Sequence, residues 1–240
     1  MSLSTRHPLS ALFATVLFAL LGARSLAQDL PDPTRFEQAI LAFEAQDKAS
    51  PAPSNGIVLT GSSSIMLWNE DAPKDLAPLT VIPRGFGGSV MNDALHYLDR
   101  VALTYKPRAI LLYEGDNDTG RNNIPTATII NQLEEIIARV HGQLPGTRIY
   151  LLAVKPSVAR EATWPAALAV NKRYQEVAAA DPLIHYIDVA TPFMKADGTV
   201  MTDIFRDDDL HLNAKGYEIW AAAIKEVLME HEAQYEHGAH

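Results

Sequence analysis

The fold is decided by the stretch IVLTGSSS, residues 57–64. Its first three residues, Ile57, Val58 and Leu59, form a short apolar run that ends at Gly61, which predicts a buried strand. Three serines follow, where a strand of a parallel sheet would give way to a loop. Because ligands of open α/β sheets bind beyond the carboxyl ends of the strands, this serine loop is the first place to look for chemistry.

The rest of the chain repeats the pattern of short apolar strands and amphipathic helices. Further strands are expected at 79–82, 109–113, 149–154 and 184–189, and helices at 34–47, 89–105, 126–143, 165–180 and 214–232. This alternation predicts a parallel sheet covered by helices on both faces. The fold class is therefore α/β, a three-layer α/β/α sandwich, with Asn213 as the cap of the last helix.

Composition narrows the function. The 240 residues, 48% hydrophobic and 20% charged, suit one globular domain. A net charge of −9 disfavours nucleic acid and anionic membranes as partners. The absence of cysteine excludes disulfides and thiolate metal sites. Because the histidines are scattered without ligand spacing, we expect no metal and no cofactor.

Residues 1–27 have the pattern of a secretory signal peptide. Arg6 precedes the apolar run LSALFATVLFALLG (residues 9–22), and Ser25 and Ala27 occupy the small-residue positions of a cleavage site. The run is shorter than the ~20 residues of a membrane span, although an uncleaved anchor is the alternative. We expect export to the periplasm or beyond, an N-terminal helix and linker at 28–55, and the main domain at 56–240.

The loops after the strands supply the groups that acyl transfer needs, namely a nucleophile, a base, a group that orients the base, and oxyanion donors. A serine of the first loop can be the nucleophile. His211 can be the base, and Asp208, three residues earlier in one compact loop, can orient its imidazole. A glycine turn and the Asn117 side chain can donate to an oxyanion. The nucleophile elbow G-x-S-x-G is absent, because Ile65 stands at its second glycine.

Four blocks of the chain resemble the SGNH hydrolase superfamily, the GDSL-like esterases and lipases. These are GSSSIMLW at 61–68, RGFGG at 84–88, GDND at 115–118 and DDLH at 208–211, in the family's order. Ser62 replaces the aspartate of the GDS motif, which is not a member of the family's catalytic triad.

The resemblance implies a flavodoxin-like, five-stranded sheet of order 2-1-3-4-5. It also implies Ser63 as nucleophile with Asp208 and His211 as its partners. The oxyanion hole would be formed by the amides of Ser63 and Gly88 and by the Asn117 side chain. Residues near the expected active edge are candidates for the substrate pocket or, as the preferred interpretation, for salt bridges that brace the loops: Arg84, Glu114, Lys155, Ser157 and Arg160.

Three functions remain open at this stage. The first is an exported esterase for short-chain esters, acetyl to butyryl, because no amphipathic insertion is long enough to form a lid over a long acyl chain. The second is a carbohydrate O-acetylesterase with the same triad. The third, of another class, is a flavodoxin-like binding protein whose serine- and glycine-rich first loop cradles a phosphate.

Overall fold

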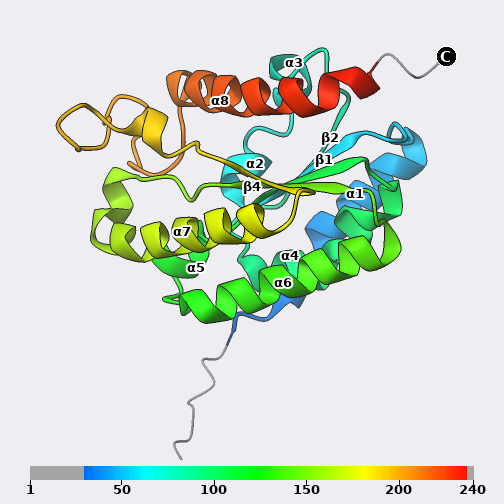
Figure 1. The fold of residues 1–240 in the computed structure, drawn as a ribbon, viewed down its shortest axis with the longest axis horizontal. Coiled ribbons are helices and arrows are strands. Elements are labelled where there is room, and N and C mark those ends of the chain that lie inside the picture. The colour runs from blue at the N-terminus through cyan, green and yellow to red at the C-terminus, as the bar shows by residue number, and fades with distance from the viewer. Residues whose placement is uncertain (1–29, 237–240) are drawn as a thin grey trace, which may run out of the picture.

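A computed structural model describes residues 30–236 as helices packed on both faces of a five-stranded parallel sheet (Figure 1). The expected signal peptide at 1–27 lies outside the described residues. The strand order is β2-β1-β3-β4-β5, which confirms the expected fold class and order. The strands are β1 (Ile57–Gly61), β2 (Val81–Gly85), β3 (Ala109–Tyr113), β4 (Arg148–Leu152) and β5 (Ile184–Ile187).

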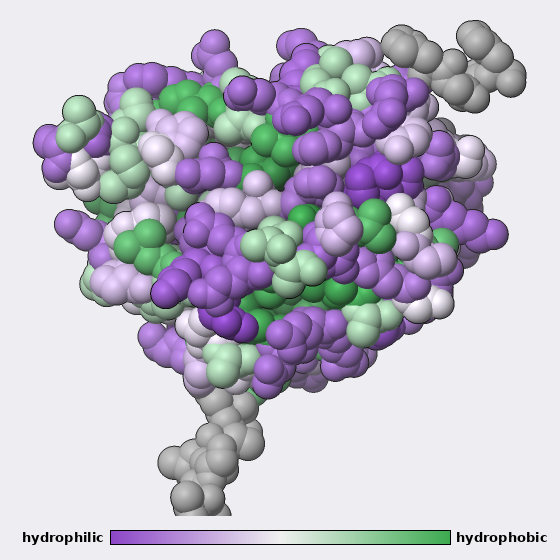
Figure 2. Space-filling view, in the orientation of Figure 1, coloured by the Kyte–Doolittle hydropathy of each residue, from purple (hydrophilic) through white to green (hydrophobic). Residues whose placement is uncertain are grey.

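The helices form the two outer layers. Figure 1 shows α4, α6 and α7 on one side of the sheet and α8 with α3 on the other, while α2 lies close to the sheet. Figure 2 shows that the outer sides are mostly hydrophilic and interrupted by apolar areas. The α-helices are α1 (Glu37–Ala49), α2 (Ser63–Met66), α3 (Ala72–Asp75), α4 (Met91–Val101), α5 (Asp116–Gly120), α6 (Thr126–Gln143), α7 (Trp164–Ala180) and α8 (Ala214–Glu232). Short 3-10 turns lie at Pro33–Phe36, Leu103–Tyr105, Val158–Thr163, Thr191–Phe193 and Ala233–Tyr235.

Alternate residues of each strand feed two separate cores. Val58 and Ile110 belong to the core shared with α4, α6 and α7. Their neighbours Ile57 and Leu59 belong to the core shared with α8, where Trp220 is fully buried. This alternation follows from the period of two of a β-strand, and it explains why the strands read as continuous apolar runs.

The carboxyl ends of three strands differ from expectation, and β5 is one of them, because it ends at Ile187, two residues early. β2 extends through Pro83 to Gly85, because it is an edge strand, where the missing N–H of a proline is tolerated. β4 ends at Leu152, two residues early. Beyond this end, the side chain of Asn171 forms the hydrogen bonds of the Val154 backbone in place of a neighbouring strand. It accepts from the N–H at 2.7 Å and donates to the carbonyl at 2.9 Å.

A buried carboxylate closes the amino edge of the sheet. Glu232 of α8 accepts from Arg148 Nε at 2.5 Å and Tyr150 OH at 2.6 Å through one oxygen. Its other oxygen accepts from Arg108 Nε at 3.0 Å and Arg148 Nη2 at 2.8 Å. Burial raises the pKa of Glu232, but the bonds from Arg148 and Tyr150 outweigh it and lower the pKa overall. We call this group the Glu232 cluster.

Candidate active site

Three side chains form a hydrogen-bonded line at the carboxyl edge of the sheet. Ser63 begins α2 directly after β1, and its Oγ lies 2.9 Å from His211 Nε2. His211 Nδ1 lies 2.5 Å from Asp208 Oδ2. Ser62 and Ser64 are buried. Of the three consecutive serines, Ser63 is therefore the one that the fold presents to the histidine.

The Asp208 carboxylate also shapes its own loop. Its Oδ1 accepts from the backbone N–H groups of Leu210, at 3.0 Å, and His211, at 2.9 Å. Asp209, between Asp208 and Leu210, adopts a left-handed conformation with φ of 56°. The pKa of Asp208 is lowered, first by the hydrogen bond from His211 and then by these backbone bonds, which outweigh the small effect of burial. Asp208 is thus ionised and orients His211 at neutral pH.

Contacts from other elements hold this loop. Lys155, just after β4, donates from Nζ to the carbonyl of Leu210 at 2.9 Å. The amide of Ala159 donates to the carbonyl of Asp209 at 3.1 Å. Asn213 caps α8 as expected, accepting from the amide of Gly216 at 3.1 Å. The loop is therefore fixed to β4 on one side and to α8 on the other.

The bonds of Asn117 decide which way its amide faces. Its Oδ1 accepts from Arg160 Nη2 at 2.7 Å, and its Nδ2 donates to the carbonyl of Ser89 at 3.0 Å. A primary amide has two N–H groups, so one remains for another acceptor. Asn117 is buried and lines the same cavity as Ser63, so the remaining donor belongs to that cavity.

Two backbone N–H groups complete the donors at this point. Within residues 30–236, neither the amide of Ser63 nor that of Gly88 has an acceptor. Gly88 has φ of +82°, a conformation that glycine adopts without strain, and no atom lies within 4 Å of where a Cβ would stand. The backbone of Gly88 therefore lies open to the cavity beside Ser63, which it lines.

Two buried acids of α5, which follows β3, fix the positions of these donors. Asp118 accepts from the amides of Met91, at 3.0 Å, and Gly115, at 2.9 Å, and so joins the second loop to the third. Burial raises the pKa of Asp118 to about 6. Asp116 accepts from Tyr113 OH at 2.9 Å and from Arg160, and its Oδ2 lies 3.4 Å from Lys155 Nζ.

Glu114 forms a second support beneath the donors. Its Oε1 accepts from Ser89 Oγ at 2.6 Å, and its Oε2 has no partner among the described residues. Burial, and then the charge of Asp118, raise the pKa of Glu114 well above its ordinary value. Its surroundings therefore favour the protonated form of Glu114 over the ionised form.

The cavity beside Ser63 has a volume of about 580 Å³. Apart from the residues already described, its lining consists of Met66, Leu67, Gly87, Arg121, Arg160, Arg206 and Leu210. No acidic side chain lines it. Arg121 and Arg206 were not among the candidates from sequence, and no motif marks them.

Of the five candidates for the pocket or for bracing salt bridges, Arg160 lines this cavity, and it also pairs with Asp116 and Asn117. The other four do not line it. Arg84 turns away from it to form an ion pair with Asp47 of α1. Glu114 and Lys155 are buried beneath the loops that they brace. Ser157 lines a separate cavity of about 370 Å³. Arg84 does not reach the cavity because it lies within β2 and not in the loop that follows the strand.

The arrangement can perform acyl transfer. A hydroxyl, an imidazole and a carboxylate lie in line, and three unused N–H donors share the cavity of the hydroxyl. Among residues 30–236, no group of three or more histidine or acidic side chains is placed to hold a metal ion. No helix in the same range is both long and apolar enough to cross a membrane.

Comparison with curated proteins identifies relatives. The chain is 25% identical to the human platelet-activating factor acetylhydrolase IB subunit alpha1 over 187 residues, which is 74% of this chain and 77% of that protein. The bovine protein of the same name is 24% identical over 182 residues, which is 72% of this chain and 75% of that protein.

Solved structures agree with these relatives. A protein from Streptococcus pneumonia, described as a platelet activating factor, superimposes with a TM-score of 0.68 and 27% identity, over 80% of this chain and 92% of that one. A lipase/acylhydrolase from Enterococcus faecalis superimposes with a TM-score of 0.62 and 25% identity, over 73% and 96% of the two chains.

The model of the GDSL-like lipase/acylhydrolase family matches residues 61–219, from the first serine loop into α8. The match includes all four sequence blocks and every side chain of the hydrogen-bonded line. This chain therefore belongs to the GDSL-like lipase/acylhydrolase family, within the SGNH superfamily, and is a carboxylic ester hydrolase.

Proposed function

We propose that the chain is an exported serine esterase that hydrolyses short-chain carboxylic esters, acetyl to butyryl, through an acyl-serine intermediate. The observation that carries the proposal is the line from Ser63 Oγ to His211 Nε2, at 2.9 Å, and from His211 Nδ1 to Asp208 Oδ2, at 2.5 Å. A hydroxyl becomes a good nucleophile when an adjacent base takes its proton and a third group orients that base.

In the acylation step, Ser63 Oγ attacks the carbonyl carbon of the ester and His211 Nε2 takes the hydroxyl proton. The negative charge that develops on the carbonyl oxygen is held by the amides of Ser63 and Gly88 and the free N–H of Asn117. When the carbon–oxygen bond to the alcohol breaks, His211 gives its proton to the departing alcohol oxygen. Asp208 stabilises the imidazolium that exists between these two transfers.

In the deacylation step, water takes the place of the alcohol. His211 removes a proton from the water, whose oxygen bonds to the acyl carbon. The bond to Ser63 Oγ then breaks, and the proton on His211 returns to Ser63. The sum is one ester and one water converted into one acid and one alcohol, with the enzyme restored.

The size of the cavity and the names of the relatives support a short acyl group. A cavity of about 580 Å³, with Met66, Leu67 and Leu210 as its apolar side chains, suits a small ester. The human and bovine relatives are named acetylhydrolases. A rate profile over p-nitrophenyl esters should therefore peak between acetyl and butyryl, and a maximum at palmitoyl would refute this part of the proposal.

Export is supported by the apolar run at residues 9–22 and the small residues before position 28. The full chain, produced in a bacterial host, should appear outside the cytoplasm and begin at Gln28 when its N-terminus is sequenced. Activity confined to the cytoplasm, with an intact N-terminus, would contradict export without affecting the esterase.

The first experiment compares hydrolysis of p-nitrophenyl acetate by the parent, Ser63→Ala and Ser64→Ala. We expect Ser63→Ala to lose at least about a thousandfold in kcat, as loss of a serine nucleophile does. The matched control Ser64→Ala should keep most of the activity, because Ser64 is buried beside the line and not part of it.

If Ser63→Ala stays active, the nucleophile is another group. If the parent itself is inactive, acetylated xylan tests the O-acetylesterase alternative. Inactivity on both substrates would refute the proposed substrate range and leave the family membership unchanged.

A further inference from the structure

The cavity beside Ser63 contains more positive charge than ester hydrolysis requires. Three arginines line it, Arg121, Arg160 and Arg206, and no acidic residue does. This is unusual in a chain whose net charge is −9, with 29 acidic and 20 basic residues. A cavity lined by charges of one sign raises the local concentration of ions of the opposite sign.

The charge of Arg160 is already used within the protein. Its Nη1 pairs with Asp116 and its Nη2 donates to Asn117 Oδ1 at 2.7 Å. Its side chain is mostly buried against α5, where a Cβ at Gly120 would overlap it. The charge of Arg160 is thus explained by its contacts with Asp116 and Asn117. These contacts do not explain the presence of Arg121 and Arg206 in the cavity.

Arg121 and Arg206 have no carboxylate partner within residues 30–236. Arg121 follows α5, and its amide donates to the carbonyl of Asn117 at 3.2 Å. Arg206 donates from Nε to the carbonyl of Leu212 at 3.0 Å, and its amide donates to the carbonyl of His211 at 2.8 Å. The main chain of Arg121 is therefore bonded to that of Asn117, the main chain of Arg206 is bonded to that of His211, and both arginines line the cavity beside Ser63.

The nearby acids do not neutralise this pair. Asp208 is engaged by His211 and by two backbone amides. Asp207 and Asp209 are exposed, and neither forms an ion pair with Arg206, although they share its loop. Asp116 faces two cations of its own, Arg160 and Lys155. The terminal amino groups of Arg121 and Arg206 thus remain available to a ligand, and a guanidinium binds carboxylate or phosphate oxygens through paired hydrogen bonds.

We propose that the preferred substrate is an ester that carries an anionic group, a carboxylate or a phosphate, which Arg121 and Arg206 bind while the ester carbonyl lies at Ser63. The proposal rests on the esterase function proposed above, because it concerns the same cavity. It gives these two arginines the role of specificity residues, since they hold a part of the substrate that does not react. The anion can belong to the alcohol or to the acyl group, and the experiment distinguishes the two.

The test compares charged esters with neutral esters of the same shape. For the alcohol side the pair is 4-acetoxybenzoate and 4-acetoxybenzamide, and for the acyl side it is phenyl hemiglutarate and its terminal amide. The measured quantity is the ratio of kcat/KM, charged over neutral, at low salt. We expect this ratio to reach on the order of tenfold on at least one side, and to fall towards one in 0.5 M NaCl, where charges are screened.

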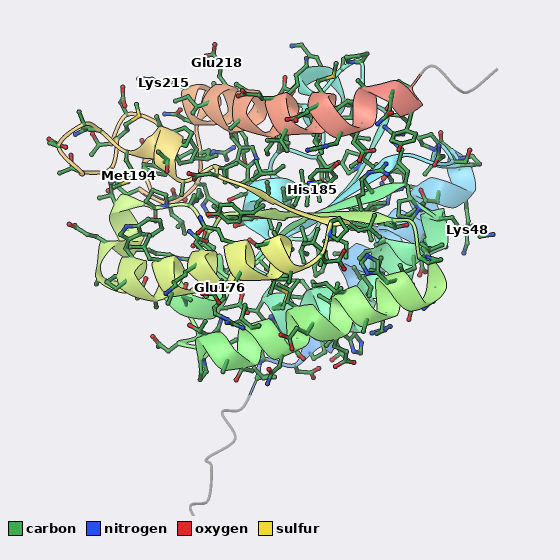
Figure 3. All side chains as sticks on the ribbon, in the orientation of Figure 1. Lys48, Glu176, His185, Met194, Lys215 and Glu218 are labelled. Carbon is green, nitrogen blue, oxygen red and sulfur yellow. The ribbon has the colours of Figure 1, made fainter. Side chains whose placement is uncertain are left out.

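Substitution then assigns the effect to residues. Arg121→Gln combined with Arg206→Gln should bring the ratio close to one, and each single variant should lower it in part. Arg173→Gln is the control, because Arg173 is an exposed arginine that does not line the cavity and that pairs at 2.5 Å with Glu176 of α7, which Figure 3 labels. It should leave the ratio as in the parent. The unfolding midpoint of each variant checks that it is folded. The effect of salt on the ratio is measured on the parent protein and does not depend on any variant.

Each result has a defined meaning. Hydrolysis of the neutral esters with a ratio near one or below on both sides would overturn the inference and leave the esterase intact. A high ratio that survives the double substitution, or that Arg173→Gln lowers equally, would also overturn it. Failure to hydrolyse any of the four esters would overturn both the inference and the proposed function.

Discussion

The two edges of the sheet each bury one carboxylate between two cations, and they use it differently. At the amino edge, Glu232 engages Arg108 and Arg148, and both of its oxygens accept two bonds. At the carboxyl edge, Asp116 lies between Arg160 and Lys155. These two cations also donate hydrogen bonds towards the cavity side, Arg160 to the side chain of Asn117 and Lys155 to the backbone carbonyl of Leu210.

The difference separates a stabilising cluster from a positioning one. The Glu232 cluster joins α8 to the starts of β3 and β4. Its members bond to one another and do not contact the cavity beside Ser63. Asp116, Arg160 and Lys155 form the Asp116 cluster. Through Arg160 and Lys155 it fixes the positions of Asn117 and of the His211 loop, which would meet a substrate. Damage to the first should therefore appear as lost stability, and damage to the second as lost rate.

Glu232→Ala should have the largest effect. It removes the buried carboxylate that Arg108 and Arg148 share and leaves Arg108 with Glu236 as its remaining acidic partner, and breaking a buried ion pair costs about 3–5 kcal/mol. Urea unfolding measures this loss, while kcat per folded molecule should stay as in the parent. Glu230→Ala, two residues earlier in α8 and exposed, is the matched control. A loss below about 1 kcal/mol would remove the contrast between the two edges.

Asn117→Ala should have the next largest effect, on rate. Removal of one oxyanion donor costs about 10²–10³ in kcat. The loss of its buried bonds to Ser89 and Arg160 should lower the free energy of unfolding by only about 1 kcal/mol. Steady-state kinetics and urea unfolding of the same preparation measure both. A variant whose stability falls steeply while its rate holds would place Asn117 with the structural residues.

Arg160→Lys should lower kcat by roughly tenfold, because one ammonium cannot reproduce the planar fork that holds Asp116 and Asn117 together. The decisive measurement is a double-mutant cycle. In an Asn117→Ala background the same substitution should have little further effect on kcat, since Arg160 acts through Asn117. Additive losses would show that Arg160 contributes independently. Arg173→Lys controls for the change of side chain.

Glu114→Gln should have the smallest effect, and it depends on pH. The folded-state pKa of Glu114 is raised by burial, so its contribution to stability is present below the unfolded pKa and is lost as pH rises through the folded one. The parent should therefore lose unfolding free energy between pH 5 and pH 9, and the variant, which has no proton to lose there, should lose less. Urea titrations at both pH values measure this, and equal losses would mean that Glu114 is ionised when folded.

Patterns that are local in sequence predicted most of the fold and the catalytic line. Asp208 and His211 lie three residues apart in one loop, and this spacing singled out Asp208 among three consecutive acids. In the structure, Asp208 Oδ2 lies 2.5 Å from His211 Nδ1. Ser63 stood out among three serines through its place after a buried strand and its resemblance to a motif. The strand order likewise came from the resemblance.

Contacts between distant parts of the chain could not be predicted in this way. Lys155 reaches Leu210, 55 residues away, and Arg160 reaches Asn117, 43 residues away. Arg84 appeared to follow a strand but lies inside one, because Pro83 is tolerated at the sheet edge. Arg121 and Arg206 line the cavity only because separate loops converge there, and sequence spacing does not record that convergence.

Ser63 and His211 lie 148 positions apart in the sequence, and this separation bears on when the enzyme becomes active. A ribosome makes the nucleophile early and the base much later, and chains acquire structure from the N-terminus as they emerge. A nascent chain that has folded through β4 presents a serine with no base beside it. If Ser63 and His211 act as proposed, ester hydrolysis needs the His211 loop beside Ser63, and α8, which follows that loop, contacts the serine loop through the bond from Tyr217 OH to the carbonyl of Ser64. On the proposed function, the chain cannot hydrolyse esters before its C-terminal part has been made.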